Sequence, residues 1–240
     1  MIEPEFFVLG LPRSGTTWLA KFFAGMNPEV LINHEAVKMD FYFDKIAAFA
    51  PWAAREYILG GRAEHIAMRQ RARPRFKRYG EITPRCRYIS GALRDAYPDA
   101  TFVHLVRDPR KAVVSMLNYG YYSTTGRPHR RQAPDAGRWS DVRRACWGWA
   151  YGHHRLRRDI PEFVRIEDLL SDFAAVENLG RILRLDCSRE AWEKQRQRKV
   201  NASRNFRTPP FEEWPPSWRR EMEETLGDEA IRYGYPKAYA

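Results

Sequence analysis

The chain has 240 residues and a formal net charge of +11, because 41 Lys and Arg residues outnumber 30 Asp and Glu residues. Its hydrophobic content of 44%, with 8 Trp, 12 Tyr and 13 Phe, can bury a core and excludes a wholly disordered chain. No apolar run approaches the ~18–20 residues of a membrane-spanning helix, and the amino terminus lacks a signal-peptide pattern. Three cysteines without metal-like spacing favour a reduced, cytoplasmic protein.

Short apolar runs alternate with helical patterns along the chain. This alternation predicts an α/β fold with a central parallel sheet flanked by helices on both faces. Ligands of such sheets bind at the carboxyl ends of the strands. Residues 123–138 predict a long irregular loop, either a functional lid or a disordered excursion. We expect strands at residues 6–9, 30–32, 101–106 and 163–166, and helices at residues 16–25, 41–73, 109–119, 168–185 and 216–233.

The first predicted strand and helix are joined by a glycine-containing turn, residues 10–17. Such a turn and the helix amino terminus together form an anion site, and its spacing resembles the nucleotide-triphosphate loop. Thr16 stands where that loop has lysine, and a cation appears inside the turn at Arg13. This departure disfavours ATP or GTP hydrolysis but leaves room for an anion with two tetrahedral centres. The alternative is a plain strand-to-helix turn with a threonine cap.

A second basic motif follows the predicted strand at residues 101–106. Arg107 leaves the strand end, Pro109 starts a helix, and Ser115 lies about two turns into that helix. Two anion sites near one sheet edge suggest a ligand that is phosphorylated at two distant positions.

Together these motifs resemble the sulfotransferase family. Residues 12–19 look like its loop for the 5′-phosphosulfate of 3′-phosphoadenosine 5′-phosphosulfate, and residues 107–115 look like its 3′-phosphate motif. Weaker matches cover residues 80–84, where Ile82 replaces a family lysine, and residues 163–169, 199–201 and 233–235. The resemblance implies a single domain over residues 1–240 with a nucleotide-kinase-like sheet and insertions around residues 40–75 and 120–140. It also implies metal-free sulfuryl transfer to a hydroxyl, or secondarily to an amine.

The resemblance assigns the donor-binding residues. Those of the first loop are Arg13, Ser14, Gly15, Thr16, Thr17 and Trp18. Arg107 and Ser115 are expected to hold the 3′-phosphate, with Lys199 and Arg204 on a closing loop.

The general base is open among three side chains. Cytosolic sulfotransferases use a histidine after a strand, and the matching region around Glu81 has none. The pattern is closer to tyrosylprotein and heparan sulfotransferases, whose glutamate base corresponds to Glu35. Burial and nearby negative charge would suit Glu35 to this role. His34 is a second candidate, Glu81 is a third, and Glu35 could instead pair with Lys38 as a surface carboxylate.

Other titratable residues have structural interpretations. His104 alternates within an apolar strand and is expected in the core, whereas His153 and His154 lie in an arginine-rich helix and are expected at the surface. Glu167 and Asp168 begin a helix, so capping would explain them. Glu81 could alternatively hold Arg85 or Arg13, or order the acceptor pocket.

Two rival functions fit parts of the sequence. A nucleotide-dependent kinase shares the fold and the first loop, and a nucleic-acid or polyanion binder would use the excess charge, although no nucleic-acid module is recognisable. The acceptor itself is open among a hydroxyl-bearing small molecule, a glycan, a lipid and a tyrosyl peptide. Aromatic stretches at residues 41–43, 119–122 and 147–151 would line an apolar acceptor pocket or belong to the core.

Overall fold

The computed structural model describes residues 2–35, 37, 39–40, 42, 46, 50–120, 133–198 and 208–236. Within these residues, five strands form a single parallel sheet in the order β2-β3-β1-β4-β5. The strands are β1 (Phe6–Gly10), β2 (Val30–Asn33), β3 (Arg78–Thr83), β4 (Thr101–Val106) and β5 (Phe163–Arg165). The α-helices are α1 (Thr16–Met26), α3 (Pro51–Tyr57), α4 (Ala63–Arg71), α5 (Ser90–Ala96), α6 (Pro109–Asn118), α7 (Asp141–Asp159), α8 (Ile166–Ser171), α9 (Phe173–Leu183), α10 (Arg189–Arg196), α11 (Pro216–Leu226) and α12 (Glu229–Arg232). A π-helical turn, Ile58–Arg62, joins α3 to α4, and short 3-10 turns cover Pro134–Arg138 and Phe211–Glu213.

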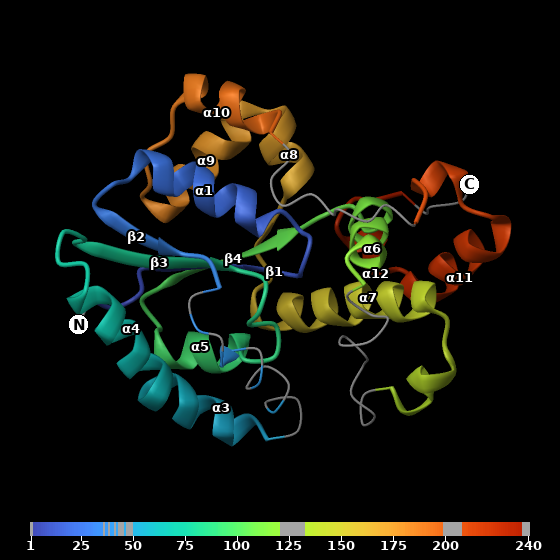
Figure 1. Cartoon of the computed structure of the whole chain (residues 1–240), viewed down its shortest axis with the longest axis horizontal. Helices are drawn as coiled ribbons and strands as arrows, with labels where there is room; N and C mark the ends of the chain where they lie inside the picture. Colours follow the sequence, from blue (N-terminus) through green and yellow to red (C-terminus); the bar gives the residue numbers. More distant parts are fainter. Residues whose placement is uncertain are drawn as a thin grey trace.

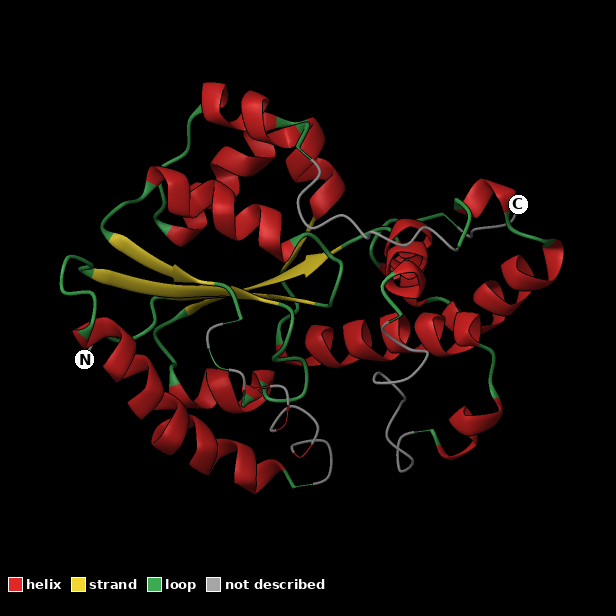
Figure 2. Ribbon diagram, in the orientation of Figure 1, coloured by secondary structure: helices red, strands yellow, loops and turns green. Residues whose placement is uncertain are grey.

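Helices cover both faces of the sheet, as predicted (Figures 1 and 2). Helices α1, α8, α9 and α10 lie over one face, and α3, α4, α5 and α7 lie over the other. The central strand β1 supplies both cores, because Phe6 and Val8 point to the first group of helices while Phe7 and Leu9 point to the second. Helices α6, α11 and α12 lie beyond the carboxyl ends of the strands.

Several predicted elements need correction. Strand β3 was missed because Arg78, Gly80 and Glu81 interrupt its apolar run. The helix expected at residues 168–185 divides at Asp172, whose side chain caps α9 by accepting the Ala174 amide. The helix expected at residues 216–233 breaks at Gly227, which has a φ of 52°.

The four predicted strands are present, and the helices expected at residues 16–25 and 109–119 are confirmed as α1 and α6. The long helical stretch expected at residues 41–73 is α3, the π-helical turn and α4 from residue 51 onward. Of the loop expected at residues 123–138, residues 123–132 lie outside the described residues, and residues 134–138 form a 3-10 turn.

Candidate functional site

The loop between β1 and α1 has a tightly fixed shape. The Ser14 amide and hydroxyl both donate to the Leu11 carbonyl, at 3.1 and 2.7 Å, which closes the turn. Gly15 has a φ of 98°, and a Cβ there would lie 2.7 Å from Ile166 Cγ1, so only glycine fits. Arg13 also has a positive φ, 72°, which costs a residue with a side chain on the order of 1 kcal/mol. The strained turn places the start of α1 at the carboxyl edge of the sheet, where helix amino termini bind anions.

The two predicted phosphate motifs meet at this edge. Arg13 Nε donates to Ser115 Oγ at 2.9 Å, and Arg107 Nη1 donates to the Arg13 carbonyl at 2.7 Å. The Arg13 guanidinium also lies 5.1 Å from the centre of the Tyr119 ring. Burial and the nearby positive charge of Arg107 lower the pKa of Arg13, and burial lowers that of Arg107. The negative charge of a bound anion would offset the cost of this burial and repulsion, so the pair favours a negatively charged ligand.

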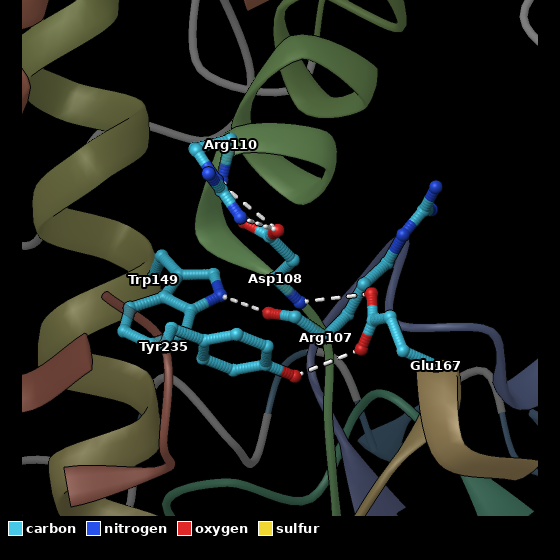
Figure 3. Close-up of polar contacts among 6 residues, drawn as sticks. All are labelled: Arg107, Asp108, Arg110, Trp149, Glu167 and Tyr235. Carbon is cyan, nitrogen blue, oxygen red and sulfur yellow. Dashed lines mark hydrogen bonds and ion pairs between the residues drawn. The ribbon is translucent and has the colours of Figure 1, made fainter. Parts of the chain in front are cut away.

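The backbone at the base of α6 is braced from two directions (Figure 3). Trp149 Nε1 donates to the Arg107 carbonyl at 3.0 Å, and the Asp108 amide donates to Glu167 Oε1 at 3.1 Å. Tyr235 then donates to the other Glu167 oxygen at 2.8 Å. Figure 3 shows the Arg107 side chain pointing away from these contacts. These contacts therefore fix the Arg107 backbone and do not involve its guanidinium, which donates to the Arg13 carbonyl.

The contacts of Glu167 correct its predicted capping role. Glu167 joins β4 to the carboxy-terminal segment rather than capping α8, and Asp168 pairs with Arg165 at 2.7 Å. The helix-capping acid at this edge is Asp108, which accepts the Arg110 amide at 2.9 Å.

His34 contacts the loop between β1 and α1, which the sequence predicts to bind phosphate and which we call the phosphate loop. Its Nε2 is 3.2 Å from Oγ1 of both Thr16 and Thr17. Burial, more than any other factor, lowers the pKa of His34, which keeps the ring neutral near pH 7. A neutral ring can orient the two threonine hydroxyls, and it remains chemically able to accept a proton.

Glu35, the residue after His34, forms an ion pair with Arg85. Arg85 follows β3, and its Nη2 donates to Glu35 Oε2; both side chains are about one-third exposed. The φ of Glu35 is 52°, a left-handed conformation that turns the chain sharply at the end of β2. Because β3 lies between β2 and β1, the pair stands beside the phosphate loop at the same sheet edge. Lys38, the other predicted partner of Glu35, lies outside the described residues.

Glu81 does not hold Arg85 or Arg13, so that prediction is wrong. It is fully buried in the sheet, where Arg62 Nη2 donates to its Oε2 at 2.6 Å and the Tyr79 hydroxyl donates to its Oε1. Arg62, also fully buried, donates through Nε to Asp40 at 2.9 Å. These contacts occupy both oxygens of Glu81, and burial raises its pKa. The carboxylate is therefore a structural group rather than a base for an acceptor.

The remaining predicted donor contacts divide into two groups. The Trp18 indole belongs to the core: it is 6% exposed, stacks on Phe22 and donates to the Gln195 carbonyl at 3.0 Å. Only the backbone amide of Trp18 is left to serve a ligand at the loop. Lys199 and Arg204 lie outside the described residues.

Two buried histidines face each other between β4 and α7. His104 is in the core as predicted, but His153 is also fully buried, contrary to the prediction, while His154 is exposed. Their Nε2 and Nδ1 atoms are 2.7 Å apart, and burial lowers the pKa of both rings, that of His104 to about 3. Both rings are consequently neutral at physiological pH.

The turn between β1 and α1 carries Arg13 and lies against Arg107 at the edge of a parallel α/β sheet, an arrangement suited to an anionic ligand. Among the described residues, no group of three or more His, Cys, Asp or Glu side chains could hold a metal ion. The described part of the chain also has no helix of the length and apolarity that a membrane crossing requires.

The chain belongs to the sulfotransferase family, whose profile matches residues 4–183. Two solved structures share its fold: a sulfotransferase from Alicyclobacillus acidocaldarius, and a sulfotransferase domain from the curacin biosynthetic pathway. The first is 16% identical with a TM-score of 0.58 and covers 97% of this chain and 94% of its own. The second is 16% identical with a TM-score of 0.52 and covers 98% of this chain and 99% of its own. No curated protein sequence matches this chain.

Proposed function

We propose that the protein transfers a sulfuryl group from 3′-phosphoadenosine 5′-phosphosulfate to a hydroxyl acceptor. The contact that supports this most directly is the junction of the two phosphate motifs, where Arg13 reaches Ser115 and Arg107 reaches the Arg13 carbonyl. One ligand with phosphate groups at both ends can engage both motifs at once. A nucleoside triphosphate has its charge at one end and would leave the Arg107 motif without a phosphate. The single sheet shared by both motifs supports assigning residues 1–240 to one transferase domain.

Donor binding uses the loop amides and the two arginines in different ways. The amides of residues 15–17 and the Arg13 guanidinium face the 5′-phosphosulfate, and Arg107 with Ser115 faces the 3′-phosphate, while the Ser14 amide and hydroxyl are used to close the turn. As the sulfur–oxygen bond to the 5′-phosphate breaks, negative charge grows on the bridging oxygen, and the amides with Arg13 stabilise it. The strained loop is already in place before the ligand arrives, so little reorganisation accompanies the reaction.

The acceptor loses its proton to Glu35 while its oxygen attacks sulfur in line with the departing phosphate. A new sulfur–oxygen bond forms, the old one breaks, and 3′-phosphoadenosine 5′-phosphate leaves. Arg85 binds Glu35 Oε2, and we assign the acceptor proton to the other oxygen, Oε1. His34 is assigned to orienting the Thr16 and Thr17 hydroxyls, with a role as base as the alternative. Such positioning and charge stabilisation carry most of the catalysis in group transfers of this type.

A ligand-dependent melting experiment tests the donor assignment. The product 3′-phosphoadenosine 5′-phosphate should raise the melting temperature, since a ligand at 100 times its Kd stabilises the folded state by about 2.7 kcal/mol. ATP with Mg²⁺ at the same concentration should have a much smaller effect. Stabilisation by ATP–Mg²⁺ alone would support the kinase alternative instead. An acceptor screen by mass spectrometry should then show the mass gain of one sulfuryl group.

A further inference from the structure

One peptide group beside the predicted 3′-phosphate site is held by side chains at both of its polar atoms. It joins Arg107 to Asp108, beyond the last paired residue of β4 and before the start of α6. Its carbonyl accepts from Trp149 Nε1 at 3.0 Å, and its amide donates to Glu167 Oε1 at 3.1 Å (Figure 3). Two side chains from different helices thus bind a peptide group that lies outside both the sheet ladder and the helix.

This arrangement controls the direction of the Arg107 side chain. The ladder of β4 fixes the chain before Arg107, and the held peptide group fixes the chain after it. The bond from Cα to Cβ of Arg107 therefore has one direction. Since the guanidinium is at the far end of a long side chain, a small rotation at its base would displace it by a larger distance.

Glu167 is held in turn by the carboxy-terminal part of the chain. Tyr235 donates to Glu167 Oε2 at 2.8 Å, so one carboxylate links this tyrosine to the Asp108 amide. The position of Tyr235 is itself fixed, because its ring is 6% exposed and its amide ends α12 in a Schellman motif. Gly234, with a φ of 77°, supplies the left-handed residue that this motif requires.

Glu167 also acts on Arg107 through its charge. Burial lowers the pKa of Arg107, and the negative charge of Glu167 opposes that shift. The same negative charge would repel an anion bound by Arg107. The hydrogen bonds of Glu167 place the arginine for binding, whereas its charge disfavours the ligand. These two effects have opposite signs, so a substitution that keeps the bonds and removes the charge can separate them.

We propose that Tyr235 and Glu167 are positioning residues, which set the affinity for the 3′-phosphate of the donor by fixing where Arg107 leaves β4. This inference rests on the proposed function, because it requires Arg107 to bind that phosphate. It gives the carboxy-terminal segment a role in donor recognition, although Tyr235 lies beyond residues 4–183, which match the family profile. Trp149 holds the other side of the peptide group, but its indole is fully buried in the core, so replacing it would disturb many contacts.

Calorimetric titration of the full-length protein with two nucleotides tests this role. 3′-Phosphoadenosine 5′-phosphate and adenosine 5′-phosphate differ only in the 3′-phosphate, so the ratio of their Kd values measures the preference for that group. Tyr235→Phe keeps the ring and removes the hydroxyl, and it should reduce the preference about three- to tenfold. Glu167→Ala removes both bonds and should reduce it by tenfold or more, on the order of a lost charged hydrogen bond. Tyr235→Phe should have no further effect once Glu167 is alanine, since it acts through Glu167.

Two further variants exclude simpler explanations. In Glu167→Gln, the amide oxygen can still accept from Asp108 and the amino group can donate to the Tyr235 oxygen, so the preference should stay at the wild-type value or exceed it. Tyr233→Phe is the matched control, because this buried tyrosine, two residues earlier, donates to the His153 carbonyl at 3.1 Å and has no bond to Glu167 among its printed partners in the core. It should lower the melting temperature without changing the preference.

The outcomes separate this inference from the proposed function. Reduced preference in Tyr235→Phe and Glu167→Ala, with wild-type preference in Tyr233→Phe, supports the positioning role. A preference that survives in Tyr235→Phe and Glu167→Ala overturns the role and leaves the donor proposal standing, as does a loss in Glu167→Gln equal to that in Glu167→Ala. If the wild-type protein shows no preference for the 3′-phosphorylated nucleotide, the donor proposal falls and the positioning role falls with it. If Glu167→Ala does not fold, the comparison of Tyr235→Phe with Tyr233→Phe decides the question.

Discussion

Removing the buried guanidinium of Arg62 should destabilise the protein severely. Arg62 is fully buried, with Nε 2.9 Å from Asp40 Oδ1 and Nη2 2.6 Å from Glu81 Oε2, and both carboxylates are buried as well. Arg62→Met keeps a long apolar stem of similar size but leaves two uncompensated carboxylates beneath the sheet. Breaking a buried ion pair in this way costs about 3–5 kcal/mol. Since domains are stable by about 5–15 kcal/mol, the variant should retain only a fraction of its stability.

Urea unfolding at pH 7, followed by tryptophan fluorescence, measures this loss. Adding Asp40→Asn and Glu81→Gln to Arg62→Met should recover most of the stability, because the triple variant holds no buried charge. Arg62→Lys should fall between wild type and Arg62→Met, since one ammonium cannot replace a planar fork that reaches both carboxylates. If Arg62→Met lies within 1 kcal/mol of wild type, or if the triple variant is no more stable than Arg62→Met, then the network does not carry the stability assigned to it.

The other predictions concern acid sensitivity and the two ends of the donor. Burial lowers the pKa of His104 to about 3 and also lowers that of His153, so below pH 6.5 the unfolded chain takes up protons that the folded protein does not. The free energy of unfolding should therefore decrease as the pH is lowered, by up to ~1.4 kcal/mol per pH unit for each histidine. Chemical denaturation between pH 7 and 5 measures this slope, which His154→Gln should leave unchanged and the double change His104→Gln with His153→Gln should flatten. A wild-type protein whose stability is equally independent of pH would contradict the prediction. Glu35→Gln should reduce turnover by about 10²–10⁴-fold without changing calorimetric affinity for the desulfated nucleotide, and wild-type turnover would rule Glu35 out as base. Arg107→Ala should weaken binding of that nucleotide by about 1.5–3 kcal/mol but scarcely affect an analogue without the 3′-phosphate, whereas equal losses for both ligands would refute the selectivity assigned to Arg107.

Local patterns explain why most of the fold could be predicted. Strands such as β1 and β4 are buried on both faces and show as continuous apolar runs. Strand β3 is also an interior strand of the sheet, but it contains the buried Glu81. The Glu81 carboxylate is paired with Arg62, which is 19 residues away in the sequence, so the local sequence of β3 does not reveal the pairing. His153 was misplaced because arginines surround it, although Trp149 and Leu156 continue the buried stripe of α7 on either side of it.

The candidate site was predictable to the extent that its motifs are contiguous. The phosphate loop and the start of α6 were found because each is a strand end, a turn and a helix start within one short segment. Arg85, the partner of Glu35, is 50 residues away from it, and neither residue type nor spacing identifies such a pair. Its only signal is topological: the ends of β2 and β3 become neighbours once the sheet order is known. The same holds for Glu167, which contacts the chain 59 residues earlier at Asp108.

The two central arginines connect the stability of the protein to its affinity for a ligand. Arg13 and Arg107 carry like charges in a half-buried site, and each has a lowered pKa because of burial. The free protein therefore holds a destabilising arrangement in place, through the Arg107 bond to the Arg13 carbonyl and the brace that Trp149 and Glu167 provide. Strain at such a position persists only where the surrounding structure fixes it. In the proposed donor complex, a doubly phosphorylated anion would offset this repulsion, so part of the stability given up in the free protein would return as affinity. On the proposed function, these two charges would favour a ligand with two anionic groups over a single phosphate, because one phosphate would offset the charge of only one arginine.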